Sequence, residues 1–394
     1  MAADKIKNAA KTAGRILFIV LMLAAAGCAR GSQQQELITI GVLLPLTGPD
    51  SEEGLRALNG LMLAREEINE SGGILGKMLD LIILNDRGDE EYIVQQYNAL
   101  REKGVAAIIG SSYSSATMAL ARAAERDGMP IISPTASNPD ITLGRGNVFR
   151  AIFIDDYQAE VMAYFAVNYL NAQTALVLKN EKAASFARTA EVFSGSFSNF
   201  GGHVIAVERF SSEAEFADIL RRYADNPPDV IYCPENFIPA AGLINTAREL
   251  GFADTPFLGS GAWDGILPHL HNRGAVKNVF YTAPFSHNDR DENVMRFVRS
   301  YFKMFSQIPL SGSATSYTCV YILADAITRA GSVEAEDIIS AMKAADLDMI
   351  TGRILFDENN NPRINVYIIT IQDGSYSLFH KTSLAEPGGL WRSR

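Results

Sequence analysis

The fold class is decided by the stretch LITIGVLL at residues 37–44, which runs into the turn PLTGP at residues 45–49. An almost unbroken apolar run of this length is typical of a strand buried on both faces, as strands of parallel sheets are. Apolar side chains at helical spacing follow from Leu55 to Ile68, and the pattern stops at Ser71-Gly72-Gly73, a glycine-rich signal for a helix end. The stretch therefore predicts a buried strand followed directly by a helix.

The same strand–helix order repeats along most of the chain. In the first half we expect strands at residues 79–84, 105–110 and 129–132, with helices at 89–103 and 116–127. In the second half we expect strands at 175–178, 204–207, 230–232, 256–259 and 278–282, with helices at 186–200, 214–223 and 240–250. Such alternation produces parallel sheets covered by helices on both faces. We therefore predict an α/β protein with two doubly wound parallel-sheet lobes, separated near residues 149–158.

The last part of the chain has a different pattern. Helices are expected at residues 293–305, 313–330 and 335–344, and strands at 365–371 and 376–379. The two strands are joined by a turn that contains Asp373-Gly374, and Asp-Gly between alternating apolar residues is a strong hairpin signal. We therefore expect an antiparallel pair of strands there.

The N-terminal region has the pattern of an export signal. Basic residues precede an apolar run at residues 16–27, which ends at Cys28. The Ala-Gly-Cys ending resembles the bacterial lipoprotein signal, in which the cysteine becomes the lipidated first residue. We therefore predict a lipoprotein signal peptide at residues 1–27, a lipid on Cys28, a polar tether at residues 28–36, and a place in the periplasm or on the cell surface. An ordinary signal peptide with an incidental cysteine is the alternative, whereas a spanning helix needs about 20 apolar residues.

Composition and missing motifs exclude several classes of protein. The 394 residues carry a formal charge of −10, and an acidic surface disfavours nucleic acid and anionic lipid headgroups as partners. The sequence contains no GxSxG or Walker pattern, so we expect no enzyme activity and no cofactor. The pair His269 and His271 is too weak a pattern to predict a metal site. Cys233 and Cys319 could form a disulfide or stay two buried thiols, and the sequence does not decide between these alternatives.

Two loops rich in hydroxyl groups follow neighbouring predicted strands. They are GSSYSSAT at residues 110–117 and ISPTASNP at residues 132–139. Open α/β sheets bind ligands at the carboxyl ends of their strands, and the free N–H groups of a following helix favour an anion there. We therefore expect a carboxylate site built by Tyr113, Ser114, Ser115, Thr135, Ala136 and Ser137. The alternative is that the serines and threonines only cap helices.

A third set of candidates follows strands of the second half. Phe186, Phe237 and Trp263 offer aromatic walls, and Glu235 or Asp264 could hold a cation. The alternative is that Trp263 packs in a core and Asp264 caps the next helix.

Taken together, several motifs resemble those of one known family. They are IGVLLPLTG at residues 40–48, AREEINESGGILG at 64–76, IGS at 109–111, ISPTAS at 132–137, Phe149-Arg150 with Asp155 and Gln158, Gly259 with Trp263-Asp264, and Ala314 with Tyr317. The chain resembles, from about Leu37 to Phe379, the extracytoplasmic solute-binding proteins of branched-chain amino acid ABC transporters, which have the type I periplasmic-binding fold.

The resemblance implies two lobes joined by three crossings, which close on a ligand by a hinge motion. It implies a first lobe of residues 37–155 plus 286–362 and a second lobe of residues 156–285 plus 363–394. It also implies that Ser114 and Ser137 bind the carboxylate of an amino acid, that the carbonyl of Thr135 accepts from its amine, and that Phe186 contributes an aromatic wall.

The chain departs from the family pattern at two places. Residues 50–53 read DSEE where the family often has an aromatic residue, and Gly261 stands where an acidic partner for the amine often sits. Asp264 or Glu235 could take over that role, and a ligand without an amine stays an alternative.

These patterns predict a lipid-anchored, monomeric receptor that captures an amino acid or a similar small carboxylate and delivers it to an ABC permease. A lipoprotein of the same fold that acts as a sensor or regulates a cell-wall enzyme is the second hypothesis. A hydrolase that uses the serine cluster is a third, weaker one, because no motif pairs a base with the serines.

Overall fold

The computed structural model describes residues 36–48 and 51–383. The chain divides into a unit at residues 1–37 and a unit at residues 38–394, and the fold belongs to the second unit. The predicted signal peptide, Cys28 and all but the last residue of the predicted tether lie outside the described residues. In the described part of the chain, none of the helices combines the length and the apolar character that a membrane crossing requires.

The first lobe is built on a five-stranded sheet with the order β2-β1-β3-β4-β5. Its strands are β1 (Leu37–Leu44), β2 (Met78–Asn85), β3 (Ile108–Gly110), β4 (Ile131–Ser133) and β5 (Val148–Arg150). The pairs β1–β3, β3–β4 and β4–β5 are parallel. The carboxyl ends of β3 and β4 therefore lie next to each other.

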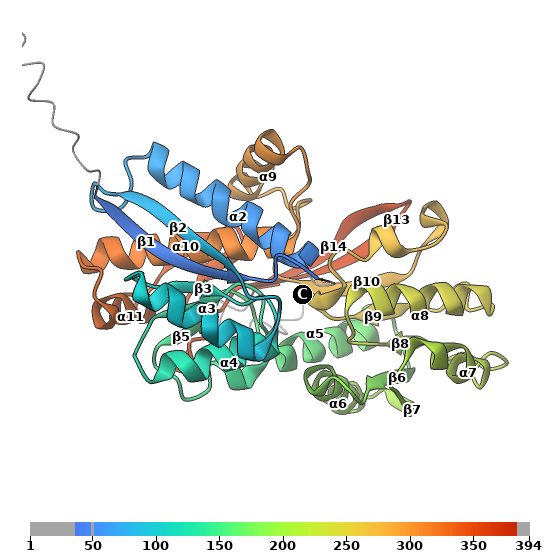
Figure 1. The fold of residues 1–394 in the computed structure, drawn as a ribbon. Helices are drawn as coiled ribbons and strands as arrows, with labels where there is room; N and C mark the ends of the chain where they lie inside the picture. Colours follow the sequence, from blue (N-terminus) through green and yellow to red (C-terminus); the bar gives the residue numbers. More distant parts are fainter. Residues whose placement is uncertain (1–35, 49–50, 384–394) are drawn as a thin grey trace, which may run out of the picture. The chain divides into compact units, whose positions relative to one another are not determined.

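Helices cover both faces of this sheet. They are α2 (Ser51–Glu70), α3 (Glu90–Glu102), α4 (Ser114–Glu125), α9 (Glu292–Phe305), α10 (Ser311–Ala330) and α11 (Ala335–Lys343). Side chains of β1 alternate between the faces: Val42 packs in the core with α2 and α10, and Leu43 packs in the core with α3 and α4. Figure 1 shows α2 and α10 side by side although they are far apart in the sequence.

The second lobe is built on a seven-stranded sheet with the order β14-β13-β10-β9-β8-β6-β7. Its strands are β6 (Thr174–Asn180), β7 (His203–Phe210), β8 (Val230–Tyr232), β9 (Phe257–Gly259), β10 (Val279–Ala283), β13 (Asn365–Gln372) and β14 (Ser375–Ser383). Strands β6 to β10 pair in parallel, whereas β13 pairs antiparallel with both β10 and β14. Its helices are α5 (Asp155–Asn168), α6 (Ala184–Asn199), α7 (Phe216–Arg221) and α8 (Phe237–Glu249).

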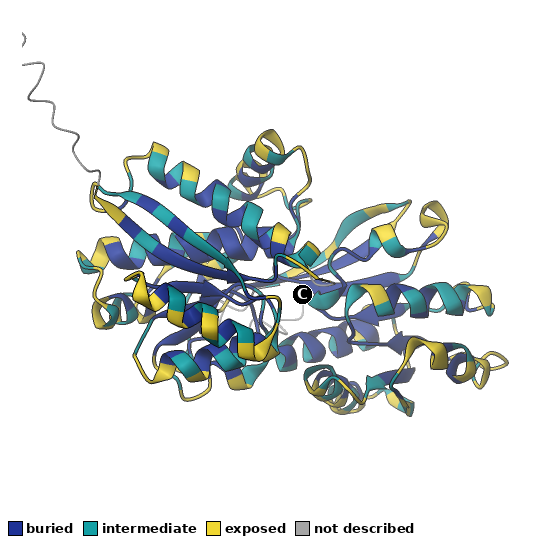
Figure 2. Cartoon of the chain, viewed as in Figure 1, coloured by how far each residue is buried: buried dark blue, intermediate teal, exposed yellow. Residues whose placement is uncertain are grey.

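Small elements complete the described chain. A two-stranded sheet is formed by β11 (Leu347–Met349) and β12 (Gly352–Ile354). Short 3-10 helices lie at Pro139–Ile141, Glu213–Glu215, Gly261–Trp263, Leu267–His269 and Arg273–Ala275. Figure 2 shows the inner strands of both sheets mostly in the dark blue of buried residues, while the edge strands β2, β7 and β14 and the outer faces of the helices carry intermediate and exposed residues.

The two lobes and the hairpin agree with the sequence predictions. The chain passes between the two sheets at residues 151–173, 284–291 and 355–364. In the hairpin, Asp373 and Gly374 have φ of 50° and 70°, as a two-residue turn with left-handed backbone requires. The predicted boundaries of the lobes, at residues 155/156, 285/286 and 362/363, stay a prediction.

One helix was not predicted from the sequence. Residues 149–158 were predicted to separate the lobes, but α5 begins at Asp155 and continues to Asn168. Its buried residues, from Ala159 to Ala166, are spread around the helix, because α5 packs against both α6 and β10. A helix buried on most sides has no one-sided apolar stripe, so its periodicity cannot be read from the sequence.

The two cysteines in the described part of the chain are not bonded to each other. Cys233 and Cys319 are both buried and free. The disulfide hypothesis is therefore wrong, and the alternative of two buried thiols is confirmed. Burial raises the pKa of both thiols well above the ordinary value, so they behave as small apolar groups.

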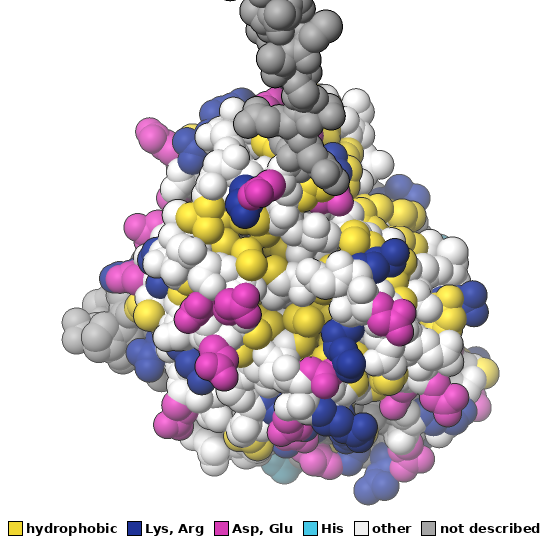
Figure 3. Space-filling view, turned by 60° about the vertical axis from the view of Figure 1, so that its left-hand side comes forward, with side chains coloured by type: hydrophobic (Ala, Val, Ile, Leu, Met, Phe, Trp, Pro, Cys, Tyr) yellow, Lys and Arg dark blue, Asp and Glu magenta, His cyan; other side chains and the backbone are white. Residues whose placement is uncertain are grey.

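On the face drawn in Figure 3, acidic and basic side chains are interspersed among the described residues.

Candidate functional site

A cavity of about 560 Å³ is lined by loops of both lobes. The first lobe contributes the loops after β3 and β4 and the first turns of α2 and α10. The second lobe contributes the segments after β6, β8 and β9 and the start of α5. These segments follow the carboxyl ends of the strands, where open α/β sheets place their ligand sites.

The first hydroxyl-rich loop leads directly into α4. Tyr113 is the N-cap residue of α4, and Ser114 is its first residue. Ser112, Tyr113, Ser114 and Ser115 all line the cavity. The Ser114 Oγ accepts a hydrogen bond of 3.3 Å from the backbone N–H of Asn138, which leaves its own proton available to an anion. The start of α4 adds a partial positive charge at the same place.

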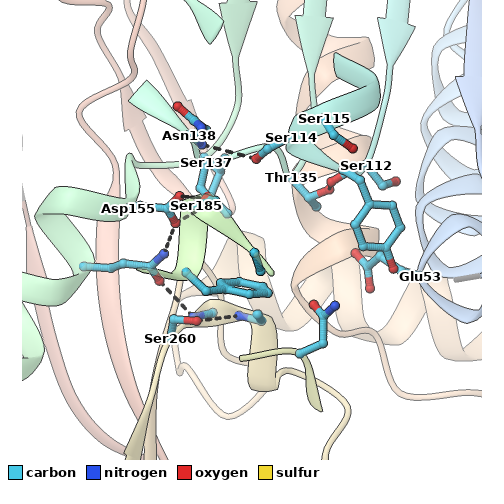
Figure 4. A pocket seen from close by; sticks show the side chains of 18 of the residues that line it. Glu53, Ser112, Ser114, Ser115, Thr135, Ser137, Asn138, Asp155, Ser185 and Ser260 are labelled. Carbon is cyan, nitrogen blue, oxygen red and sulfur yellow. Dashed lines mark hydrogen bonds between the residues drawn. The ribbon is translucent and has the colours of Figure 1, made fainter. Parts of the chain in front are cut away.

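The second hydroxyl-rich loop lies beside the first, as predicted from the neighbouring strands. The Thr135 Oγ1 donates to the carbonyl of Ser112 at 2.8 Å and ties the two loops together. Arg150 holds the second loop in place by donating hydrogen bonds to the carbonyls of Ala136 at 2.9 Å and Asn138 at 2.8 Å. Arg150 is 0% exposed, and burial lowers its pKa to about 10. Figure 4 shows Ser112, Ser114, Ser115 and Thr135 close together at one side of the cavity.

Asp155 joins the second loop to the second lobe. Its carboxylate accepts hydrogen bonds from Ser137 at 2.7 Å, from Gln158 at 2.7 Å and from Ser185 at 2.8 Å. Burial raises the pKa of Asp155, while these donors favour its charged form. Ser137 thus donates its proton to Asp155 and can only accept a hydrogen bond from a ligand. Its predicted role as a hydroxyl donor to a carboxylate does not fit this arrangement.

The other predicted site residues divide into two groups. Phe186, Phe237 and Asp264 line the cavity, as do Thr135 and Ser137 from the first lobe. Trp263, Glu235 and Ala136 lie outside the described lining of the cavity, and all three are buried.

Packing explains why these three residues do not face the cavity. Trp263 is 0% exposed and belongs to the core formed with α7 and α8, which was the alternative considered for it. Glu235 accepts hydrogen bonds from the Asn180 side chain and from the backbone N–H of Asn236, and burial raises its pKa. Ala136 packs in the core with α3 and α4, its backbone N–H donates to the Ser133 Oγ at 3.2 Å, and its carbonyl accepts from Arg150.

Asp264 is already bonded through both carboxylate oxygens. Its Oδ1 accepts from the Tyr281 hydroxyl at 2.9 Å, and its Oδ2 accepts from the backbone N–H of Ser311 at 2.6 Å. Asp264 therefore caps α10 of the first lobe, whereas the alternative considered from the sequence was a cap on the next helix in the chain.

Several residues that line the cavity were not predicted from the sequence. Ser112 and Ser311 are both 6% exposed, and their Oγ atoms have no hydrogen-bond partner among the described residues. Ser112 lies within the predicted loop, and Ser185 stands next to Phe186, so both had a local signal. Ser311 lies far along the chain in a separate helix, and no motif marked it.

Comparison with known proteins identifies the family. The profile of the family described as periplasmic binding protein matches residues 37–375. The chain belongs to the periplasmic binding protein family. This membership implies an extracytoplasmic location, and the predicted resemblance and the predicted fold class are confirmed.

Similar periplasmic binding proteins come from several bacteria. The Leu/Ile/Val-binding protein BraC3 of Rhizobium johnstonii is 28% identical over 82% of this chain and 88% of its own length. The leucine-, isoleucine-, valine-, threonine- and alanine-binding protein of Pseudomonas aeruginosa is 26% identical over 88% of this chain and 93% of its own. The crystal structure of the leucine-binding protein LivK from Thermotoga maritima superposes with a TM-score of 0.79 at 27% identity, over 87% of this chain and 98% of that one.

Proposed function

We propose that this periplasmic binding protein captures an amino acid or a similar small carboxylate and presents it to an ABC-type permease for import. The named relatives bind branched-chain amino acids, and they support this ligand class for the present chain. Binding is non-covalent, needs no cofactor and involves no enzyme activity. We further propose that the protein is a monomer held at the membrane by a lipid on Cys28.

The observation that carries the proposal is the pair of neighbouring hydroxyl loops on one cavity. The Ser114 hydroxyl proton has no acceptor among the residues that the structure describes, and Ser114 stands at the positive end of α4, so it is suited to a carboxylate. The buried Oγ atoms of Ser112 and Ser311 lack described partners, and an unsatisfied buried polar group costs about 1–3 kcal/mol. A polar ligand in the cavity would remove that cost.

Another part of the lining suits an apolar side chain. Met118, Ile152, Phe186 and Phe237 all contribute to the wall of the cavity. A pocket with many apolar contacts and a few polar anchors is the usual form of a small-molecule site. A cleft filled by side chains would favour the alternative of a regulator of a cell-wall enzyme, whereas this open cavity favours a solute receptor.

Replacing Ser114 by alanine tests the carboxylate site. We expect Ser114→Ala to weaken the binding of an amino acid about ten- to hundredfold, because a hydrogen bond to a charged group is lost. Calorimetric titration measures the affinity, and urea unfolding checks that the fold is intact. Ser194→Ala is the matched control, because within the described part of the chain the Ser194 hydroxyl bonds only to the Ala190 carbonyl of its own helix. Unchanged affinity in Ser114→Ala would remove the site assignment.

A further inference from the structure

The cavity contains four acidic residues, and three of them are poor partners for a ligand amine. Asp155 accepts from Ser137, Gln158 and Ser185, and Asp264 accepts through both oxygens. Glu90 lies on the exposed side of the first turn of α3. The fourth acidic residue, Glu53, is in a different situation.

Glu53 has a carboxylate oxygen that is available to a ligand. It stands in the first turn of α2, and its side chain is 18% exposed. Its Oε2 lies 3.5 Å from the Arg56 Nη1, while its Oε1 accepts no hydrogen bond from the residues that the structure describes. The Oε1 lies against Gly312 in the first turn of α10, where an added Cβ would be only 2.2 Å from it. The missing side chain at Gly312 therefore makes room for the Glu53 carboxylate.

The charges around Glu53 leave a deficit of positive charge. Arg56 forms ion pairs with Glu52 and Glu53, and its Nη1 donates to the backbone carbonyl of Asp264 at 3.2 Å. The Asp264 carboxylate adds a third negative group near the same guanidinium. One cation thus faces three carboxylates, so a further cation in the cavity is favoured there.

We propose that Glu53 binds the cationic amine of the ligand, in place of Asp264 or Glu235. This assignment rests on the proposed function and makes the ligand a zwitterion, because Ser114 takes the carboxylate and Glu53 takes the amine. An ammonium group has three donors, and the residue before Gly312, Ser311, has an Oγ without a partner among the described residues that could act as a second acceptor. In the view of Figure 4, Glu53 lies on the same side of the cavity as Ser112 and Ser115, and Ser260 lies on the opposite side.

The test compares each ligand with and without its amine. The twenty standard L-amino acids are screened by thermal shift, and the best binder is titrated by calorimetry beside the same molecule lacking the amine. We expect Glu53→Gln to weaken the amino acid about ten- to hundredfold and the deaminated acid less than about threefold. Glu52→Gln is the matched control, because Glu52 pairs with the same Arg56 but lies outside the described lining.

A second variant tests the placement of the carboxylate without removing its charge. Gly312→Ala adds a methyl group where the Glu53 Oε1 lies, so the carboxylate has to move while the α10 backbone stays helical. We expect the same selective loss of the amine-bearing ligand.

The outcomes separate this proposal from the proposed function. Selective loss in Glu53→Gln and Gly312→Ala supports Glu53 as the amine partner. Equal loss of both ligands in Glu53→Gln, no loss, or selective loss in Asp264→Asn alone overturns that role while solute binding stands. If the unmodified protein binds neither amino acids nor deaminated acids, the proposed function fails, and the role of Glu53 fails with it.

Discussion

The hydroxyl groups of the cavity differ in where their protons are directed. Ser137 donates to Asp155 at 2.7 Å and Thr135 donates to the Ser112 carbonyl at 2.8 Å, so both hydroxyls mainly hold the loops in place. The Ser114 Oγ accepts a backbone N–H at 3.3 Å and keeps its proton available. Residue type alone does not distinguish the three side chains, whereas their hydrogen bonds support the proposal that Ser114 donates to the ligand and that the other two hold the loops.

If Glu53 binds the ligand amine as proposed, its protonation makes ligand binding depend on pH. Burial raises the pKa of Glu53, and this effect outweighs the opposing effect of Arg56. The charged groups that act on it are Arg56, Asp264 and Glu52, and His269 lies 4.0 Å from Glu52. Glu90, Arg122 and Lys182 also line the cavity.

We expect the affinity for the amino acid to fall as the pH is lowered. The ionised form of Glu53 attracts the amine, and it is lost as the pH falls through a pKa that lies above the ordinary carboxyl value. Calorimetric titration between about pH 7.5 and about pH 4.5 should show the loss begin in the mildly acidic range. In Glu53→Gln the affinity should vary much less over the same range. An identical pH profile in both proteins would contradict the role given to Glu53.

Among the secondary-structure elements, the 3-10 helix Gly261–Trp263 contributes residues both to the cavity wall and to the core. Gly261 and Ala262 line the cavity, while Trp263 turns into the core. A Cβ on Gly259 would lie 2.1 Å from the Trp263 ring, so the ring packs directly on the backbone of β9.

We expect Trp263→Ala to destabilise the fold by about 3–5 kcal/mol, as loss of a large buried ring does. Trp263→Phe keeps most of the volume and should retain the ligand affinity of the unmodified protein. Urea unfolding measures the stability and calorimetry measures the affinity. A large loss of affinity in Trp263→Phe at unchanged stability would place Trp263 in the binding site instead.

The same elements show how much could be predicted from the sequence. Strands such as β1 and β6 were predicted because a strand buried on both faces is a continuous apolar run, and the hairpin was predicted because Asp373-Gly374 has a local turn signal. Helix α5 was missed because it is buried on most sides.

Site residues with a local sequence signal could be predicted, whereas contacts between segments far apart in the sequence could not. The two hydroxyl loops could be placed side by side, because each follows a strand of one parallel sheet. The bond from Ser311 N–H to Asp264 and the contact of Glu53 with Gly312 join segments far apart in the sequence. No local sequence pattern indicates such contacts, so the prediction from the sequence was Asp264 or Glu235 as the partner of the ligand amine.

The two lobes together determine whether a solute can be held. The first lobe supplies the hydroxyl loops and Glu53, and the second supplies Phe186, Phe237 and Ser185. Arg56 connects the lobes, since it donates to the Asp264 carbonyl at 3.2 Å and lies 5.5 Å from the centre of the Phe237 ring. A solute in the cavity therefore contacts both lobes at once and favours the conformation in which they meet.

The most direct test is mass spectrometry of the small molecule released from the protein after purification without unfolding. The proposed function predicts about one equivalent of a small solute, and the role of Glu53 predicts that it carries both a carboxylate and an amine. The same preparation from Ser114→Ala should release much less of it. Release of no small carboxylate from the unmodified protein, together with no gain in thermal stability when amino acids are added, would contradict the central claim.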